Sequence, residues 1–277
     1  MNFSLKEKGR FKTSCKLGEG AFCFDGEGAW VDIETKNIFI TNNGEIDFYS
    51  TNSRPSVIYD INKDEIIFGS DKGICTINRD TNNEKVISSS PSAIQLTHRS
   101  NDGNTFANGM ILSFMHIESP NESNGYIYTC IGDNWSLIDS TINIPNTFID
   151  LGKSEYLISD SHNQTIWKFS LDNSGNLLNK SLWNELSEIG SPDGGCSIGN
   201  FHLIALWDGS GIAVFDSEGK IIEIIEMPMP RPTNCAFDEE NRLLWVTSAR
   251  AGLSVKDLKK FPSSGDTYLY YVEGHFE

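Results

Sequence analysis

The sequence predicts an all-β fold built from one repeated strand pair. Short apolar segments typical of buried strands recur along the chain, and each is followed by a second strand candidate that opens near a Gly or small polar turn. The first members are 29–32, 65–68, 110–113, 156–159, 203–206 and 244–247, and the partners are 45–48, 73–76, 125–128, 165–168, 211–214 and 267–270. The partners begin about 44 residues apart on average, within the roughly 40 to 50 residues of a propeller blade. We therefore expect a six-bladed β-propeller in which residues 1–277 form a single domain.

The turn residues agree with this fold. Asn43-Gly44, Asp71-Lys72-Gly73, 172–175 and 216–219 have the Asn, Asp and Gly composition of hairpin connections. Helical periodicity is nearly absent, and the segment 180–186 is short enough to be a single helical turn or a loop. A two-sheet sandwich also has many short strands, but the regular spacing at blade length favours the propeller.

Composition limits the partners of the chain. The formal net charge is −16 and the densest basic segment is 256–260, so an average phosphate backbone is repelled and nucleic acid is not an expected partner. No stretch is long and apolar enough to span a membrane, and residues 1–11 lack the apolar core of a secretion signal. The six cysteines are scattered without a C-x-x-C pair, which favours reduced thiols and a cytoplasmic location. The oligomeric state is not indicated.

Three oxygen-bearing side chains lie in Gly-containing turns that are far apart in the sequence. They are Glu19 in Gly-Glu-Gly, Asn101 in Asn-Asp-Gly and Asp193 in Pro-Asp-Gly. A toroidal fold brings such loops together at its axis, where carboxylate and amide oxygens can bind a hard divalent cation. The pattern therefore predicts a metalloenzyme.

A series of short motifs resembles the gluconolactonase and regucalcin (senescence marker protein) family, in the order in which that family has them. The resemblance runs from about Leu17 to about Ser264. The motifs are Leu17-Gly18-Glu19-Gly20, Trp30-Val31-Asp32-Ile33, Arg99-Ser100-Asn101-Asp102-Gly103, Ile144-Pro145-Asn146, Ser159-Asp160-Ser161, Pro192-Asp193-Gly194, Pro228-Met229-Pro230-Arg231-Pro232-Thr233 and Val246-Thr247-Ser248-Ala249-Arg250. The family consists of six-bladed propellers with one divalent metal at the axis, which implies the same fold here.

The resemblance also implies site residues. The family's metal ligands correspond to Glu19, Asn146 and Asp193. Its substrate-contacting residues correspond to Arg99, Asn101 and Glu118, although the family's Gly-Thr-Met segment before the last of these is Ser113-Phe114-Met115 here.

This residue set suits hydrolysis of a sugar lactone, an activity of carbohydrate metabolism. Two carboxylates and an amide oxygen favour Ca²⁺, with Mg²⁺, Mn²⁺ or Zn²⁺ as alternatives. A cation with open positions polarises a lactone carbonyl, and Asp193 is the candidate general base for the attacking water. Arg99 and Asn101 can orient the hydroxyls of a small-molecule substrate such as gluconolactone.

Other interpretations stay open at this stage. Taken singly, Glu19, Asn101 or Asp193 would be an ordinary turn residue. The same site also suits a promiscuous esterase or organophosphate hydrolase, or a propeller that binds a metal or a partner without turnover. The chain departs from the family pattern at Ala21 and Ser113, where a changed pocket wall would alter the preferred lactone.

Overall fold

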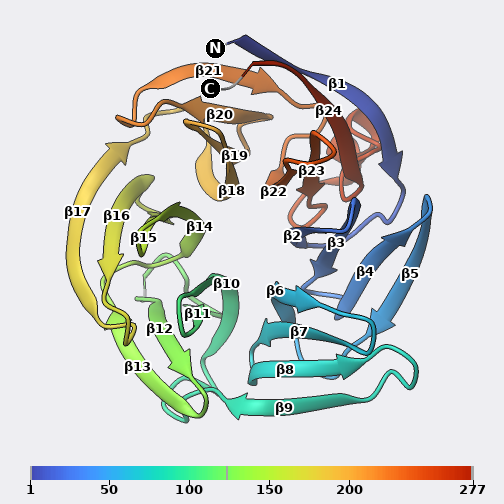
Figure 1. The fold of residues 1–277 in the computed structure, drawn as a ribbon. Helices are drawn as coiled ribbons and strands as arrows, with labels where there is room; N and C mark the ends of the chain where they lie inside the picture. The colour runs from blue at the N-terminus through green and yellow to red at the C-terminus, as the bar shows by residue number, and fades with distance from the viewer. Residues whose placement is uncertain (1, 123, 276–277) are drawn as a thin grey trace.

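Six four-stranded antiparallel sheets surround a central axis in a computed structural model that describes residues 2–122 and 124–275 (Figure 1). The sheets are the blades of a six-bladed propeller, which confirms the predicted fold. From the axis outwards, the first three blades are β2 (Gly18–Phe24), β3 (Glu27–Asp32), β4 (Asn37–Asn42) and β5 (Glu45–Ser50); β6 (Pro55–Ile61), β7 (Glu65–Ser70), β8 (Gly73–Asn78) and β9 (Glu84–Ser89); and β10 (His98–Phe106), β11 (Gly109–His116), β12 (Tyr126–Ile131) and β13 (Asn134–Asp139).

The last three blades follow the same order, except that the sixth takes its outermost strand from the beginning of the chain. They are β14 (Pro145–Gly152), β15 (Glu155–Asp160), β16 (Thr165–Leu171) and β17 (Leu177–Glu185); β18 (Ser191–Ile198), β19 (Phe201–Trp207), β20 (Gly211–Phe215) and β21 (Ile221–Glu226); and β22 (Pro232–Asp238), β23 (Leu243–Ser248), β24 (Thr267–His275) and β1 (Asn2–Phe11). The pairing of β1 with β24 closes the ring, and the two ends of the chain lie side by side (Figure 1).

The sequence predicted six strand pairs. The first strand of every pair is the second strand of a blade, and the partner is the third strand of the blade in five of the six pairs. The segment 45–48 is an exception, because it belongs to β5, the outermost strand of the first blade, and the partner of β3 is β4. The segment 180–186 was predicted as a helical turn or a loop, but residues up to 185 belong to β17, where pairing with β16 outweighs local propensity. The short helix α1 (Val255–Lys260), with a capping box at Ser254, was not predicted.

The core lies between neighbouring blades and is built mainly by their second and third strands. Ile66 and Phe68 of β7 pack with Ile38 and Ile40 of β4, for example, across the junction of the first two blades. At the junction of the first and sixth blades, Trp30 stacks near Trp245 with ring centroids 6.4 Å apart, as expected for tryptophans that pack between blades. No helix among the described residues is long and apolar enough to cross a bilayer.

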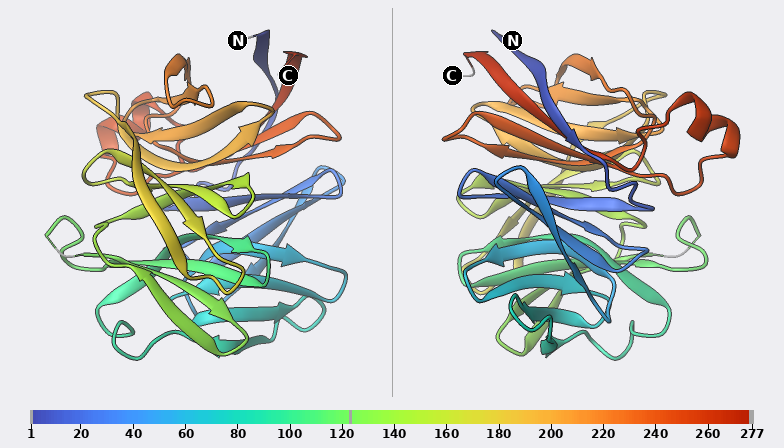
Figure 2. Two further views of the ribbon diagram at one scale, coloured as in Figure 1. Left: turned by 60° about the vertical axis from the view of Figure 1, so that its left-hand side comes forward. Right: turned by 90° about the vertical axis from the view of Figure 1, so that its right-hand side faces the viewer.

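The innermost strands pair with the second strands through an interrupted register. Each of the six pairs formed by a first and a second strand contains a β-bulge or irregularity, whereas each pair formed by a second and a third strand is continuous. A bulge re-aims side chains and bends the strand locally. The helix α1 and the segment 117–122 project from the same end of the ring (Figure 2).

Candidate metal centre

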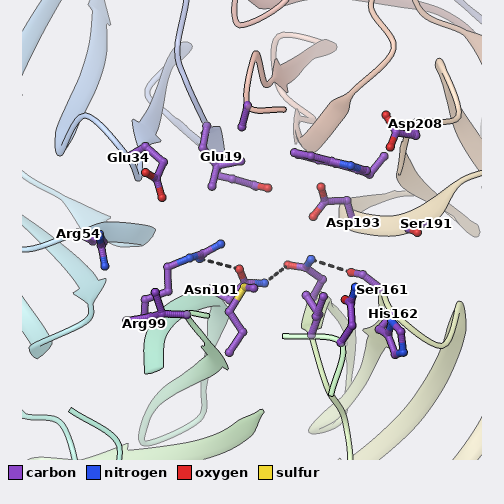
Figure 3. A pocket seen from close by; sticks show the side chains of 18 of the residues that line it. Glu19, Glu34, Arg54, Arg99, Asn101, Ser161, His162, Ser191, Asp193 and Asp208 are labelled. Carbon is purple, nitrogen blue, oxygen red and sulfur yellow. Dashed lines mark hydrogen bonds between the residues drawn. The ribbon is translucent and has the colours of Figure 1, made fainter. Parts of the chain in front are cut away.

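A cavity of about 650 Å³ opens at the end of the ring where the segment 117–122 projects. It has the size of a small-molecule binding pocket. Five of the six residues that the sequence predicted for the site line it: Glu19, Arg99, Asn101, Asn146 and Asp193. Figure 3 labels four of them, and their side chains extend into the pocket from different blades: Glu19, Arg99, Asn101 and Asp193.

The bulges of the innermost strands bring these side chains together. Register shifts fall between Glu19 and Phe22 in β2, between Asn146 and Ile149 in β14, and around Asp193 in β18. In the first blade, Gly20 has φ +56° and a Cβ added to it would lie 2.7 Å from the Ser56 carbonyl oxygen. Only glycine fits this position without a shift of the backbone, so the Gly after Glu19 has a steric role.

A chain of hydrogen bonds orients the amide groups at the floor of the pocket. Arg99 Nη1 donates to Asn101 Oδ1 at 2.8 Å, and Asn101 Nδ2 donates to Asn146 Oδ1 at 2.8 Å. Asn146 Nδ2 donates to Ser161 Oγ at 2.9 Å, as the dashed lines in Figure 3 show. Because both Nδ2 groups have acceptors, the orientation of the amides is determined by the network. Asn146 Oδ1 keeps one lone pair for a further partner.

Glu19 and Asp193 form a pair of buried carboxylates. Their exposed fractions are 7% and 4%. Burial raises the pKa of both groups well above the usual range, and the neighbouring negative charges raise them further, from Asp193 and Asp102 on Glu19 and from Asp102 on Asp193. A side-chain hydrogen bond with Glu19 lowers the pKa of Asp193 in part. Two buried carboxylates in contact need a shared proton or a cation for compensation.

The protein supplies little positive charge at this point. Arg99 lowers the pKa of Glu19 and of Asp193, but only as a minor contribution to each. Burial lowers the pKa of the Arg99 guanidinium itself, while Glu34 and Glu19 raise it. A divalent cation at this point would stabilise the ionised forms of Glu19 and Asp193, which burial disfavours.

The donor set fits a hard divalent cation. It consists of oxygens from Glu19, Asn146 and Asp193, which is the chemistry that Ca²⁺ and Mg²⁺ prefer. No group of three or more His, Cys, Asp or Glu side chains in the described part of the chain has an arrangement suited to a metal. The candidate set contains two carboxylate residues, Glu19 and Asp193, and its third oxygen donor is the amide of Asn146.

Glu118 lies apart from the other predicted residues. Its side chain is exposed on the loop after β11, and its backbone N–H donates to His116 Nδ1. The pocket is lined instead by Met115 and Ile117 from the same segment. Glu118 as a substrate contact therefore stays a prediction without support from the pocket lining.

The two departures from the family pattern lie outside the main pocket. Ala21 borders a second, smaller cavity of about 270 Å³, which is lined by residues further along the innermost strands. Ser113 is buried, and its hydroxyl donates to the carbonyl oxygens of Asp102 at 2.7 Å and Pro145 at 3.2 Å. Neither residue belongs to the lining of the 650 Å³ pocket.

Sequence reasoning missed several residues of the pocket wall. Lys16, Glu34 and Arg54 line the wall formed by the first two blades. On the opposite side, Trp207 lies below the Arg231 guanidinium, 4.6 Å from the ring centroid, and Arg231 binds Asp208 with Nε to Oδ1 at 2.6 Å. Trp207, directly before Asp208-Gly209, is the one aromatic residue that the sequence singled out for attention, and it lies at the end of β19, where the strand leaves the ring.

Comparison with known sequences assigns the family. The SMP-30/Gluconolactonase/LRE-like region matches residues 17–250. This chain belongs to that family. Among curated members, a 6-deoxy-6-sulfogluconolactonase from Pseudomonas putida is 30% identical over 118 residues, which are 41% of this chain. The match spans 40% of the length of that relative.

Solved structures of similar shape carry related names. The calcium-binding protein regucalcin from Agrobacterium tumefaciens has a TM-score of 0.88 at 22% identity, covering 98% of this chain and 96% of that one. A luciferin-regenerating enzyme has a TM-score of 0.82 at 20% identity, covering 96% of both chains. A gluconolactonase from Xanthomonas campestris has a TM-score of 0.74 at 16% identity, covering 95% and 88%. At these identities the likeness shows the propeller fold.

Proposed function

We propose that this protein is a divalent-metal-dependent lactonase that opens a sugar lactone of the aldonolactone class. The observation that carries the proposal is the buried pair Glu19 and Asp193, which lies beside an oriented amide oxygen in a pocket of small-molecule size. The name of the matched Pseudomonas relative and membership in a gluconolactonase family support lactonase activity.

Glu19, Asn146 and Asp193 would hold the cation, and Ca²⁺ is our first candidate because the donors are all oxygens. When bound, the cation supplies Lewis-acid polarisation of the lactone carbonyl. Asp193 in its ionised form accepts a proton from the attacking water. The water oxygen bonds to the carbonyl carbon, the ring C–O bond breaks, and the proton passes to the released alkoxide. One water is consumed and one hydroxy acid is formed.

Arg99 and Asn101 would orient the sugar. The Arg99 Nη1 group is already committed to Ser100 O at 2.9 Å and Asn101 Oδ1 at 2.8 Å, which fixes the plane of the guanidinium. Its remaining N–H groups can donate to hydroxyls of the substrate. A preorganised donor of this kind loses little rotamer entropy on binding, so it favours one pose of the lactone ring.

The test is hydrolysis of an aldonolactone panel, followed by proton release, with chelator-treated protein to which Ca²⁺, Mg²⁺, Mn²⁺ or Zn²⁺ is restored. We expect metal-dependent turnover that Asp193→Ala abolishes. The matched control is Asp208→Ala, which removes a carboxylate from the pocket rim without touching the predicted ligands. Circular dichroism checks that each variant is folded.

Two results would contradict the proposal. Turnover of organophosphates or simple esters in preference to every lactone would indicate a different hydrolase at the same site. Absence of turnover with any metal, in folded protein that still binds Ca²⁺, would indicate a propeller that binds metal without catalysis.

A further inference from the structure

One wall of the pocket is basic, in a chain whose formal net charge is −16. Lys16, Arg54 and Arg99 come from the first three blades and line the same cavity as the carboxylate pair. In Figure 3, Arg54 and Arg99 lie on one side of the pocket with Glu34, and Asp193 and Asp208 lie on the other. The two arginines therefore lie opposite the two aspartates across the pocket.

The cations near the pocket differ in whether a partner is present. Lys16 Nζ pairs with Glu34 Oε2 at 3.2 Å, and Arg231 pairs with Asp208. Arg99 donates to Ser100 and Asn101. For the Arg54 guanidinium, the described residues provide no acceptor at hydrogen-bond or ion-pair distance, although the side chain is half-buried.

The backbone of Arg54 is nevertheless held firmly. Its N–H donates to Asp71 Oδ1 at 2.9 Å, and its carbonyl oxygen accepts from the Asp71 N–H at 3.3 Å. The Ser100 hydroxyl contacts the same carbonyl at 3.4 Å. Pro55 follows directly and restricts the conformation of Arg54. A cation that is anchored through its backbone and lacks a protein acceptor is suited to binding an anion from outside.

The charge of Arg54 acts on the rest of the site. It contributes to lowering the pKa of Arg99, after burial as the main cause, so the two guanidinium groups repel each other on the same side of the pocket. Glu34 faces Arg99 as a partial counter-charge but is shared with Lys16. An anionic ligand between the guanidinium groups would relieve this repulsion.

We propose that Arg54 forms an anion-binding subsite, so that the preferred substrate is a sugar lactone carrying a second acidic group on its chain, remote from the lactone carbonyl. This inference rests on the proposed lactonase function. The acidic group is a carboxylate, a sulfonate or a phosphate monoester, because each accepts two N–H donors from a guanidinium in a planar arrangement. The carbonyl end of the same molecule lies toward Glu19 and Asp193.

The first experiment compares the kcat/KM of matched lactones with bound Ca²⁺. Glucono-1,5-lactone is the neutral member, and the 6-phospho and 6-deoxy-6-sulfo derivatives and a glucarolactone are the anionic arms. We expect the preferred anionic lactone to exceed the neutral one by about tenfold or more, as one charge-assisted contact allows. The preferred arm identifies the acidic group.

Three variants distinguish a specific contact of the Arg54 guanidinium from a general effect of positive charge on anionic lactones. Arg54→Met should raise the KM for the anionic lactone about tenfold and leave the neutral lactone within about twofold. Arg54→Lys should restore part of the difference, since it keeps the charge but loses the planar fork. Arg79→Met is the matched control, because Arg79 lies in the same blade, contacts Tyr49 and Asn62, and does not line the pocket.

A binding measurement keeps the inference testable apart from turnover. Calorimetric titration with glucitol 6-phosphate against glucitol should show binding of the phosphorylated polyol that Arg54→Met weakens and Arg79→Met does not. If lactones are hydrolysed without preference for the anionic members, or if the preference survives Arg54→Met, the subsite is overturned and the lactonase stands. If no lactone is hydrolysed but Arg54-dependent binding remains, the lactonase is overturned and the subsite stands.

Discussion

The innermost and the second strands of each blade differ in regularity and in what they bury. The second strands pair without interruption with the third strands, and their buried residues are mostly apolar, as in β19 with Leu203, Ile204 and Leu206. The innermost strands are interrupted by bulges and bury polar groups such as Glu19, Asp102 and Asn146. The difference indicates that regular pairing provides stability, whereas the irregular pairing next to it creates the candidate site.

The bulges of the six innermost strands are not equivalent. Those of the first, third, fourth and fifth blades contain or border Glu19, Asn101, Asn146 and Asp193. The bulges of the second and sixth blades contain Ser56 and Thr233. β-Bulges therefore recur in the innermost strands around the axis. The type of residue at each bulge determines the chemical role of that bulge.

Removal of a packed ring from a second strand should have the largest effect. Trp30 is fully buried between blades. Trp30→Ala should lower the free energy of unfolding by about 3 to 5 kcal/mol, because it leaves a cavity in a close-packed junction. Urea denaturation monitors this. Unchanged stability, or a loss of Ca²⁺ binding as complete as in a ligand variant, would contradict the assignment of stability to the second strands and of the site to the innermost strands.

Removal of a carboxylate from an innermost strand should act on the metal. We expect Glu19→Gln to weaken Ca²⁺ binding by more than about a hundredfold. Mutation of residues that only support the ligands of a metal already lowers metal affinity about 10- to 100-fold. Isothermal titration calorimetry is the measurement. The metal-free variant should be at least as stable as the metal-free parent, because a buried acidic group with a raised pKa has been replaced by a neutral one. Ca²⁺ affinity equal to that of the parent would exclude Glu19 as a ligand.

The pH dependence of the metal-free protein should reveal a third buried acid. Burial raises the pKa of Asp102 to about 7, from an ordinary value of 3.8, and Oδ2 has no hydrogen-bond partner. Between about pH 4 and pH 7 the unfolded chain releases a proton that the folded protein retains, so the free energy of unfolding falls as the pH rises. One pKa unit corresponds to about 1.4 kcal/mol, which makes the loss on the order of a few kcal/mol.

Asp102→Asn should flatten this dependence in part, while Glu19 and Asp193 account for the remainder. Urea denaturation in the presence of a chelator, at about pH 4.5 and pH 7.5, measures the slope. Stability that instead rises with pH over this range would show that Asp102 is ionised in the folded protein.

The smallest effect should come from the second blade. Among the residues that the structure describes, the Ser56 hydroxyl makes only a long contact of 3.5 Å to the Gly69 carbonyl oxygen. Ser56→Ala should change the free energy of unfolding by less than about 1 kcal/mol and leave Ca²⁺ affinity and lactone turnover within twofold. A strong loss of metal binding here would mean that the second blade also serves the site, which would remove its distinction from the blades that carry predicted ligands.

The sequence predicted the second strands well because both of their faces are buried. Burial on both sides produces short uninterrupted apolar runs such as 203–206, whose limits are visible without neighbours. The innermost strand β18 has the sequence of a turn, Ser-Pro-Asp-Gly-Gly, and was not predicted as a strand. The backbone of β18 forms its ladder hydrogen bonds with β19, and the strand propensity of the residues in β18 does not predict this pairing.

The candidate site could be predicted in part for a related reason. Glu19, Asn146 and Asp193 lie in short motifs that are visible in the sequence, and they line one pocket. Arg54 was missed because Asn-Ser-Arg-Pro reads as a polar turn, and only the ring places it opposite Asp193. Glu118 was proposed from its position after a motif, but a loop that leaves the ring directs it to the surface.

The closure of the ring by β1 has a consequence during protein synthesis. β1 is synthesised before β2 to β23 and pairs with β24, which follows them, so β1 has no partner while those strands are made. An unpaired edge strand is prone to association with other chains. The alternating charges of Lys6, Glu7 and Lys8 in β1 disfavour such association before β24 is available for pairing.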